Sequence, residues 1–341
     1  MSLKLPNQMR AWWMHMGAST TQLQLREVPV PTLGPGQVLV RMHAASLNRG
    51  EFLTGHGLHG APDTWKAIGS EGAGEVVAVA PDVQGMSLGL RVMGRCAGSY
   101  AEFALMQADE AMVMPERLSW NKGAAVPLTF LVAYDMLVQQ GLLHARTAQS
   151  TQPPPWVLIN GVSSGVGVAT LQLAKAWGAR VIGTSGSQTK IDQLNPLGLD
   201  VGLVTRAADF APQVLEHTQG HGANVIVNTV GGSMLAENVR AAAFEARLAV
   251  VGYVDGVVRA ELDLEMLHAK RLCIYGVSNK LRSQAQRAAV VPVFVRDVLP
   301  ALDDGRIEPQ IDSVFAFDDL PLAKARMEAA GHVGKIVLSL N

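Results

Sequence analysis

Cysteine is scarce in this sequence: the 341 residues include only Cys96 and Cys273. Two cysteines cannot build the disulfide framework of a small secreted fold, and so low a number fits a reducing compartment. An excess of either charge is missing as well, because 28 Lys and Arg residues stand against 29 Asp and Glu residues, for a net charge of −1. This balance argues against nucleic acid or an anionic membrane surface as a partner.

Long hydrophobic runs are also absent. Apolar stretches are short and broken by glycine or polar residues, so the sequence predicts no transmembrane helix. The N-terminal residues Met1-Ser2-Leu3-Lys4 lack a signal-peptide h-region, and we therefore expect a cytoplasmic protein. Hydrophobic residues still make up 48% of the chain, and its length is enough for two domains of ~150 residues each.

The most informative segment that is present begins at Trp156. We expect a strand at 156–160, a Gly-rich turn at 161–167, a helix at 166–177 that ends before Gly178, and a second strand at 180–184. Elements in this order predict the first βαβ unit of a dinucleotide-binding fold. Glycine allows the backbone to turn sharply beside a pyrophosphate, and the helix N-terminus offers it unpaired N–H groups.

The glycine spacing of the turn is irregular. A strict G-x-G-x-x-G pattern would place glycine at 162, 164 and 167, where this sequence has Val162, Ser164 and Gly167. The flanking strands and helix favour a nucleotide site, and the alternative is a structural turn that binds nothing. The turn residues assigned to the cofactor are Ser163, Ser164, Gly165 and Val166.

No carboxylate follows the second predicted strand, and this absence indicates which dinucleotide to expect. NAD-selective sites need an acidic residue there to bind the ribose 2′-hydroxyl. Here the strand is followed by Ser185, with Lys190 nearby and Arg206 after the third predicted strand. These side chains can bind a 2′-phosphate, so the sequence favours NADPH over NADH. Lys190 has a second interpretation as an ordinary solvated helix lysine.

The order of the predicted elements indicates an α/β protein with two parts. Residues 11–115 are β-rich, with turn signals such as Gly34-Pro35-Gly36 between short strands, and a helix is expected at 124–140. Six strands then alternate with helices, which predicts a doubly wound, parallel Rossmann sheet. These strands are expected at 156–160, 180–184, 199–204, 225–229, 247–252 and 272–277. Helices at 291–303 and 320–330, with strands at 311–317 and 335–340, are expected to return to the first part.

Several short blocks along the chain are typical of one family. They are Gly69-Ser70-Glu71-Gly72-Ala73-Gly74-Glu75-Val76-Val77, Val126-Pro127-Leu128-Thr129, Ala133-Tyr134, Asn228-Thr229-Val230-Gly231-Gly232, Val251-Gly252-Tyr253 and Gly334-Lys335-Ile336-Val337-Leu338. Together they resemble the medium-chain dehydrogenase/reductase superfamily, and within it the zinc-independent quinone oxidoreductase-like branch. One departure is Leu90, in Gly89-Leu90-Arg91-Val92, where the family usually has Asp.

The resemblance implies a fold and an assembly. It implies a GroES-like, β-rich catalytic domain at 1–127, completed by 281–341, and a Rossmann domain at 128–280. It also implies a homodimer, because in this family an edge strand near 272–277 can extend the sheet across a two-fold axis.

The resemblance further indicates that no metal is bound. The family's catalytic zinc ligands fall on Asn48, Ser70 and Leu128, none of which offers the thiolate or imidazole that zinc needs. The four-cysteine lobe that would hold a structural zinc has a single cysteine here. His56 and His59 follow Asn48 in a loop, and we interpret them as polar loop residues rather than ligands.

Without zinc there is no Lewis acid to polarise an alcohol or a simple carbonyl. A quinone or an α,β-unsaturated carbonyl remains a suitable acceptor, because it delocalises the charge of an incoming hydride. The resemblance therefore implies an NADPH-dependent oxidoreductase that acts on a small-molecule acceptor of this kind.

Three residues are candidates for catalysis. The amide of Asn48 could bind the acceptor oxygen or the nicotinamide. Arg49 either stabilises an enolate or quinol oxyanion or forms a salt bridge with Glu51 or Glu71. Tyr253 stacks, donates a proton or only packs, and solvent is an alternative proton source. The remaining residues assigned to the cofactor are Thr129, Asn228, Val251, Gly252, Tyr253 and Val277.

Other functions stay open at this point. A zinc-type alcohol dehydrogenase would need the missing ligands. A non-catalytic NADPH-binding protein would have the same cofactor site. A domain for polyketide-type enoyl reduction is a further possibility, against which the chain length favours a free-standing enzyme.

Overall fold

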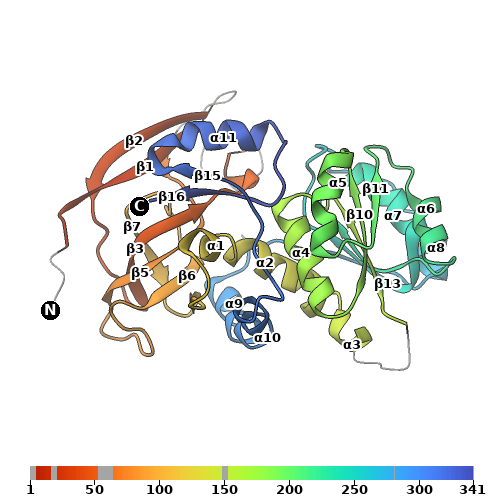
Figure 1. Ribbon diagram of the computed structural model, residues 1–341, viewed down its shortest axis with the longest axis horizontal. Coiled ribbons are helices and arrows are strands. Elements are labelled where there is room, and N and C mark those ends of the chain that lie inside the picture. Colours follow the sequence, from red (N-terminus) through yellow and green to blue (C-terminus); the bar gives the residue numbers. More distant parts are fainter. Residues whose placement is uncertain (1–4, 17–20, 53–63, 148–152, 280, 341) are drawn as a thin grey trace. The chain divides into compact units, whose positions relative to one another are not determined.

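The structure is a computed structural model that describes residues 5–16, 21–52, 64–147, 153–279 and 281–340. Two compact units are present (Figure 1): one combines Met1–Leu128 with Arg282–Asn341, and the other is Thr129–Leu281. The first is built on antiparallel sheets and the second on a parallel sheet with helices. The predicted fold class, a Rossmann sheet with a GroES-like β-rich domain, is confirmed.

The second unit contains a six-stranded parallel sheet in the order β11-β10-β9-β12-β13-β14. The strand order reverses between β9 and β12, the place where ligands bind in open α/β sheets. Figure 1 shows α4 and α5 on one side of this sheet and α6 and α7 on the other. The strands are β9 (Trp156–Asn160), β10 (Arg180–Ser185), β11 (Val201–Val204), β12 (Ala223–Asn228), β13 (Ala242–Val250) and β14 (Cys273–Gly276).

Central strands of this sheet are buried on both faces. Val157, Leu158 and Ile159 of β9 have no exposed surface, as expected for a continuous apolar strand inside a parallel sheet.

None of the described helices is long and apolar enough to cross a bilayer. The helices of this part of the chain are α2 (Pro127–Tyr134), η2 (Asp135–Gln139), α3 (Leu143–Thr147), α4 (Gly165–Ala176), α5 (Gln188–Leu194), η3 (Asn195–Leu197), α6 (Ala211–His217), η4 (Gly232–Met234), α7 (Leu235–Ala241) and α8 (Leu264–Ala269).

The first unit contains two sheets. One has the order β15-β16-β3-β5-β6-β8, with β7 also paired to β3, and the other has the order β2-β1-β4. Their strands are β1 (Gln8–Met16), β2 (Thr21–Pro29), β3 (Gln37–Ser46), β4 (Trp65–Ala67), β5 (Glu71–Val79), β6 (Arg91–Arg95), β7 (Phe103–Gln107), β8 (Ala111–Val113), β15 (Ile311–Ala316) and β16 (Lys335–Ser339).

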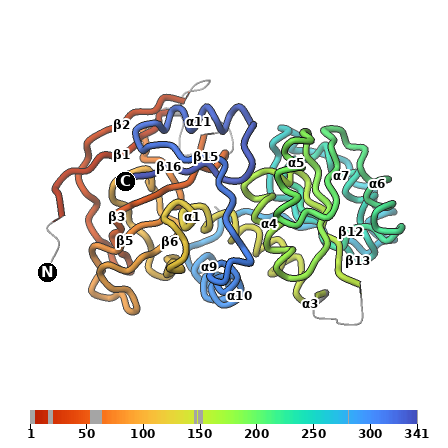
Figure 2. The backbone as a smooth tube through the Cα atoms, in the orientation of Figure 1, coloured from red at the N-terminus to blue at the C-terminus, as the bar shows by residue number. Residues whose placement is uncertain are grey.

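Residues from both ends of the chain share the core of this unit. Strand β16 pairs with β3, so that Leu338 lies opposite Ala45, and Trp12 Nε1 donates a 2.9 Å hydrogen bond to the Phe317 carbonyl. Figure 2 shows the C-terminal segment running beside the N-terminal strands. The helices here are η1 (Arg49–Glu51), α1 (Trp120–Ala124), α9 (Gln284–Ala288), α10 (Val291–Asp303), η5 (Phe317–Asp319) and α11 (Leu320–Glu328).

The helix predicted at 124–140 is wrong as a single element. Helix α1 ends at Ala124, a new helix begins at Pro127, and the backbone becomes a π-helix at Asp135. Proline has no N–H to continue a helix and disfavours the helical conformation of the preceding residue, whereas it fits well at a first helical position. The apolar pattern does not reveal this break.

Candidate active site and cofactor-binding turn

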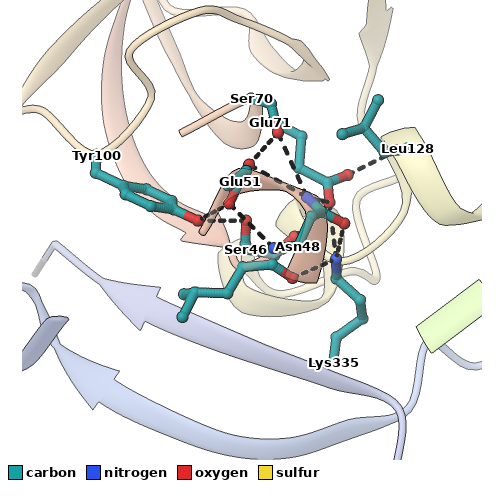
Figure 3. A network of polar contacts seen from close by, with 9 residues as sticks. Ser46, Asn48, Glu51, Ser70, Glu71, Tyr100, Leu128 and Lys335 are labelled. Carbon is teal, nitrogen blue, oxygen red and sulfur yellow. Dashed lines mark hydrogen bonds and ion pairs between the residues drawn. The ribbon is translucent and has the colours of Figure 1, made fainter. Parts of the chain in front are cut away.

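Polar side chains gather inside the first unit, where the end of β3, η1 and the starts of β5 and β16 meet (Figure 3). We call this group the polar network. Glu71 and Ser46 have no exposed surface, and Lys335 is only 5% exposed. Buried charges are stable in a protein only when they are paired and hydrogen-bonded. The members are Ser46, Asn48, Glu51, Ser70, Glu71, Tyr100, Lys335 and the backbone N–H of Leu128.

The ammonium of Lys335 contacts three oxygens. Its Nζ donates to the Leu47 carbonyl at 2.9 Å, to Asn48 Oδ1 at 2.8 Å and to Glu71 Oε1 at 2.8 Å. An ammonium has three donors, so these bonds match its full capacity. Hydrogen bonds between charged groups are among the stronger ones in proteins, and this ion pair is shielded from solvent at both ends.

The carboxylate of Glu71 accepts bonds on both oxygens. Besides Lys335, Oε1 accepts from Ser46 Oγ at 2.7 Å and from Asn48 Nδ2 at 2.9 Å. Oε2 accepts from the backbone N–H of Leu128 at 2.6 Å. The Asn48 amide is therefore held at its oxygen by Lys335 and at its nitrogen by Glu71.

A second carboxyl, Glu51, lies beside the first. It accepts hydrogen bonds from the hydroxyls of Ser70 and Tyr100, and from the Asn48 N–H at 3.1 Å. Loss of contact with water raises the pKa of the Glu51 carboxyl, although the hydrogen bonds act in the opposite direction. Burial also raises the pKa of Tyr100, and the neighbouring Glu51 charge adds to this effect.

Arg49 has a different contact from the salt bridge that we considered. Its Nη2 donates to the Met327 carbonyl at 3.3 Å, and the carboxylates of Glu51 and Glu71 are bound by other groups. A guanidinium carries five N–H donors, so one such bond leaves it able to bind an oxyanion as well.

In the second unit, the Gly-rich turn follows β9. Gly161 has a φ of +76°, in the left-handed region that favours glycine, and its N–H donates to the Thr184 carbonyl at 3.2 Å. Ser164 then caps α4, because its Oγ accepts from the Gly167 N–H at 3.0 Å and donates to the Gly161 carbonyl at 2.9 Å. A Cβ on Gly167 would lie 2.5 Å from that carbonyl oxygen, so the helix needs glycine there.

This turn has the features of an anion site. The first turn of the twelve-residue helix α4 carries the N–H groups of Gly165 and Val166, which have no acceptor within the helix. The helix dipole adds positive potential at the same end. Ser163 precedes the cap and is 9% exposed. The turn therefore fits a pyrophosphate, which its backbone N–H groups would bind.

The end of β10 carries polar and charged side chains suited to a further phosphate. Ser185 pairs with Val204 of β11, and its carbonyl accepts from the Thr205 N–H at 2.9 Å, which brings the next residue, Arg206, close. A Cβ on Gly186 would overlap Arg206 Nε, so the guanidinium lies where a side chain would be. Lys190 is on the following helix, α5.

Three other predicted cofactor residues lie at the carboxyl ends of strands: Asn228 ends β12, Val251 follows β13 and Val277 follows β14. Val251 donates its N–H to the Asn228 carbonyl at 3.0 Å, and Val277 donates to the Val250 carbonyl at 3.0 Å. The Asn228 side chain also closes its own turn, since its Oδ1 accepts from the N–H groups of Val230 and Gly231 at 3.0 Å each. The remaining positions are Thr129 in α2, 3% exposed, Gly252, and Tyr253, 41% exposed.

Two family models match the chain. The alcohol dehydrogenase GroES-like domain matches residues 34–116, and the zinc-binding dehydrogenase model matches residues 165–292. A mycobacterial protein solved in complex with NADPH is 26% identical, with a TM-score of 0.82 over 97% of this chain and 100% of that one. The chain belongs to the medium-chain dehydrogenase/reductase superfamily.

Similar regions also occur within larger proteins. A phenolphthiocerol/phthiocerol polyketide synthase of Mycobacterium tuberculosis is 31% identical over 305 residues, which is 89% of this chain and 14% of that protein. The chain spans between 5% and 15% of the length of the curated relatives compared. The CurK enoyl reductase structure has a TM-score of 0.80 over 98% of this chain and 100% of that one, and at 22% identity it supports the fold alone.

Zinc, which the name of one family model implies, does not fit the described site. Asn48 Nδ2 and Ser70 Oγ lie 3.5 Å apart, and the third position, Leu128, contributes a backbone N–H that donates to Glu71 Oε2. The Lys335 ammonium already lies between the oxygens that a cation would use, and zinc favours thiolate or imidazole donors. No group of three or more His, Cys, Asp or Glu suited to a metal is found among the described residues. His56 and His59 lie outside them.

Sequence reasoning missed two members of the polar network that carry charge in this member of the superfamily. Lys335 lies in the block Gly334-Lys335-Ile336-Val337-Leu338, and Glu71 in the block that begins at Gly69. Both blocks carry the resemblance, but Glu71 was considered only as a salt-bridge partner of Arg49, and Lys335 was assigned no role. A lone lysine within an apolar strand is a usable signal, because an unpaired charge is rarely buried.

Proposed function

We propose that the chain is an NADPH-dependent reductase that transfers hydride to an α,β-unsaturated carbonyl compound or a quinone. The main support for this proposal is the polar network. In it, the Lys335 ammonium binds Asn48 and Glu71 beside the positions that correspond to the metal ligands of zinc-type relatives. The match to a polyketide synthase favours an enoyl thioester among these acceptors. A position in the quinone oxidoreductase-like branch remains part of the proposal.

The proposed reaction adds a hydride and a proton to the conjugated double bond of the acceptor. When bound, NADPH supplies a hydride, which adds to the β-carbon of the acceptor while the carbonyl oxygen takes up the negative charge. The double bond is reduced, and solvent supplies a proton to the α-carbon. Hydrogen-bond donors near this oxygen lower the barrier. We propose Arg49 and the Asn48 amide as these donors, and Tyr253 as a residue beside the nicotinamide.

Preference for NADPH is proposed from the end of β10. Ser185 offers a hydroxyl, and Arg206, which packs against Gly186, offers a guanidinium that matches the geometry of a phosphate. Lys190 is proposed as a further cation at this site. Ser163, Ser164, Gly165 and Val166 are proposed to bind the pyrophosphate, and Thr129, Asn228, Val251, Gly252 and Val277 to lie along the nicotinamide half.

Replacement of one arginine tests the cofactor assignment. Arg206→Gln is expected to weaken NADPH binding by about tenfold or more, the value of one charge-assisted bond, and to change NADH binding little. Arg180→Gln is a matched control, because Arg180 lies at the opposite end of β10 and stacks over Trp156 at 4.3 Å. Titration of both cofactors by fluorescence gives the ratio, and an equal loss of NADPH and NADH binding would contradict the assignment.

A panel of acceptors tests the reaction itself. Protein dialysed against a chelator is mixed with NADPH and, in turn, a short enoyl thioester, an unsaturated ketone and a quinone, and separately with NADP⁺ and a simple alcohol. We expect turnover with at least one conjugated acceptor and none with the alcohol. Activity with the alcohol that disappears after chelation would favour the zinc-type alternative instead.

A homodimer is proposed from the edge of the parallel sheet. Strand β14 pairs with β13 on one side and is the last strand in the described sheet. An unpaired strand edge can bind the same edge of a second copy about a two-fold axis. Light scattering of the full chain would show twice the monomer mass if this is correct.

A further inference from the structure

The oxygens around Lys335 form a small cage for a cation. A backbone carbonyl, an amide oxygen and a carboxylate oxygen, from Leu47, Asn48 and Glu71, all lie within 2.9 Å of Nζ. Figure 3 shows the three oxygens converging on the tip of the lysine side chain. Lys335, Glu71 and Leu47 are buried, and Asn48 is half-buried, so the ammonium has little contact with solvent.

The cage connects several segments of the first unit. Through Glu71, the charge of Lys335 acts on Ser46 at the end of β3 and on the Leu128 N–H at the start of α2. Lys335 also binds Asn48, which directly precedes Arg49 in the chain, so it fixes the backbone at the start of η1. An ammonium removed from this place would leave a carboxylate and an amide oxygen buried without their cation, and both would reorient.

We propose that the Lys335 ammonium is the built-in cation of this site and a positioning residue, and that its three oxygens form a binding site for a small alkylammonium ion when the side chain is removed. The positioning part rests on the proposed function, because it states that the ammonium holds Asn48 and Arg49 in place for hydride transfer. The binding part depends only on the cage, so the two can fail separately.

The test uses Lys335→Ala in the full chain, with propylammonium chloride as the probe. Propylammonium reproduces the atoms of the lysine side chain beyond Cβ, and n-propanol has the same length without the charge. We expect the variant to unfold on the order of 10 °C below the wild type, because a buried charge loses its partner. Propylammonium should restore several degrees of this loss, while n-propanol and tetramethylammonium chloride should not.

A double variant, Lys335→Met with Glu71→Gln, provides the matched control. It removes both charges with little change in shape, so it should fold and show no selective response to propylammonium. The binding part is overturned if n-propanol stabilises Lys335→Ala as well as propylammonium does, or if the double variant responds equally. It is also overturned if Lys335→Ala unfolds at the wild-type temperature.

Kinetics tests the positioning part. We expect Lys335→Ala to lose at least tenfold in kcat with the acceptor used by the wild type, at an unchanged Kd for NADPH, and to regain activity with propylammonium. Recovery of the unfolding temperature without recovery of kcat would overturn the positioning role and leave the cage intact. Inactivity of the wild type towards every acceptor would instead reject the proposed function.

Discussion

The side chain of Ser164 stabilises both helix α4 and the turn before it. Its hydroxyl satisfies the Gly167 N–H and binds the Gly161 carbonyl, so the same oxygen both caps α4 and closes the turn before it. A strict G-x-G-x-x-G pattern would require glycine at 162 and 164, where Val162 and Ser164 stand, and Gly161 instead forms the left-handed turn. Serine replaces a second glycine because a cap needs a side-chain acceptor.

Removal of this cap gives the first prediction. Ser164→Ala is expected to lower the free energy of unfolding by about 1 kcal/mol, the usual value of a helix N-cap. Ser187→Ala is the control, since Ser187 holds the N-cap position of α5 without a side-chain bond to the helix. Urea denaturation of both variants measures the difference. Equal stability of the two would mean that the Ser164 bonds contribute nothing.

Glu51 gives a prediction about pH. Burial raises its pKa in the folded state above the unfolded value, so the folded protein binds the proton more tightly. The sign follows: this contribution to stability is fully present below the unfolded pKa and is lost as the pH rises through the folded pKa. Relative to Glu51→Gln, the wild type should therefore become less stable from weakly acidic towards neutral pH. Urea denaturation across this range measures the difference, and a wild type that gains stability relative to the variant as the pH rises would contradict the prediction.

Among the helices and strands, several positions in both units followed from apolar runs and turn residues. Strand β9 and helix α10 lie at the expected positions, because long buried runs leave little choice of register. The break at Pro127 and the π-helix at Asp135 were not predicted. The break has a local cause in Pro127, which the apolar pattern alone does not reveal.

Close packing of α4 on the turn gives a prediction at this scale. A Cβ on residue 167 would collide with backbone oxygens of Gly161 and Val162, which cannot move aside as a side chain would. Gly167→Ala is therefore expected to destabilise the protein by about 1–3 kcal/mol and to weaken NADPH binding. Gly276→Ala is the control, because a Cβ there meets no atom within 4 Å. Thermal unfolding with and without NADPH distinguishes the two, and similar midpoints would refute the packing argument.

In the whole molecule, the Gly-rich turn and the polar network lie in different units. The second unit contains the Gly-rich turn, which was predicted because backbone turns are local in sequence, and the proposed site for a 2′-phosphate. The first unit contains the polar network, of which Asn48, Ser70 and Leu128 stand at the positions predicted to correspond to the family's zinc ligands. Lys335 lies 264 residues from Glu71 along the chain, so only the fold reveals that they meet.

Transfer of a labelled hydride tests directly whether the protein reduces a conjugated acceptor with NADPH. NADPH that carries deuterium at the transferred position of the nicotinamide is mixed with the chelator-treated protein and an enoyl thioester, and the product is analysed by mass spectrometry and NMR. We expect one deuterium at the β-carbon and a solvent proton at the α-carbon. Reduced product without deuterium, or no product from any conjugated acceptor despite tight NADPH binding, would contradict an NADPH-dependent hydride transfer by this protein.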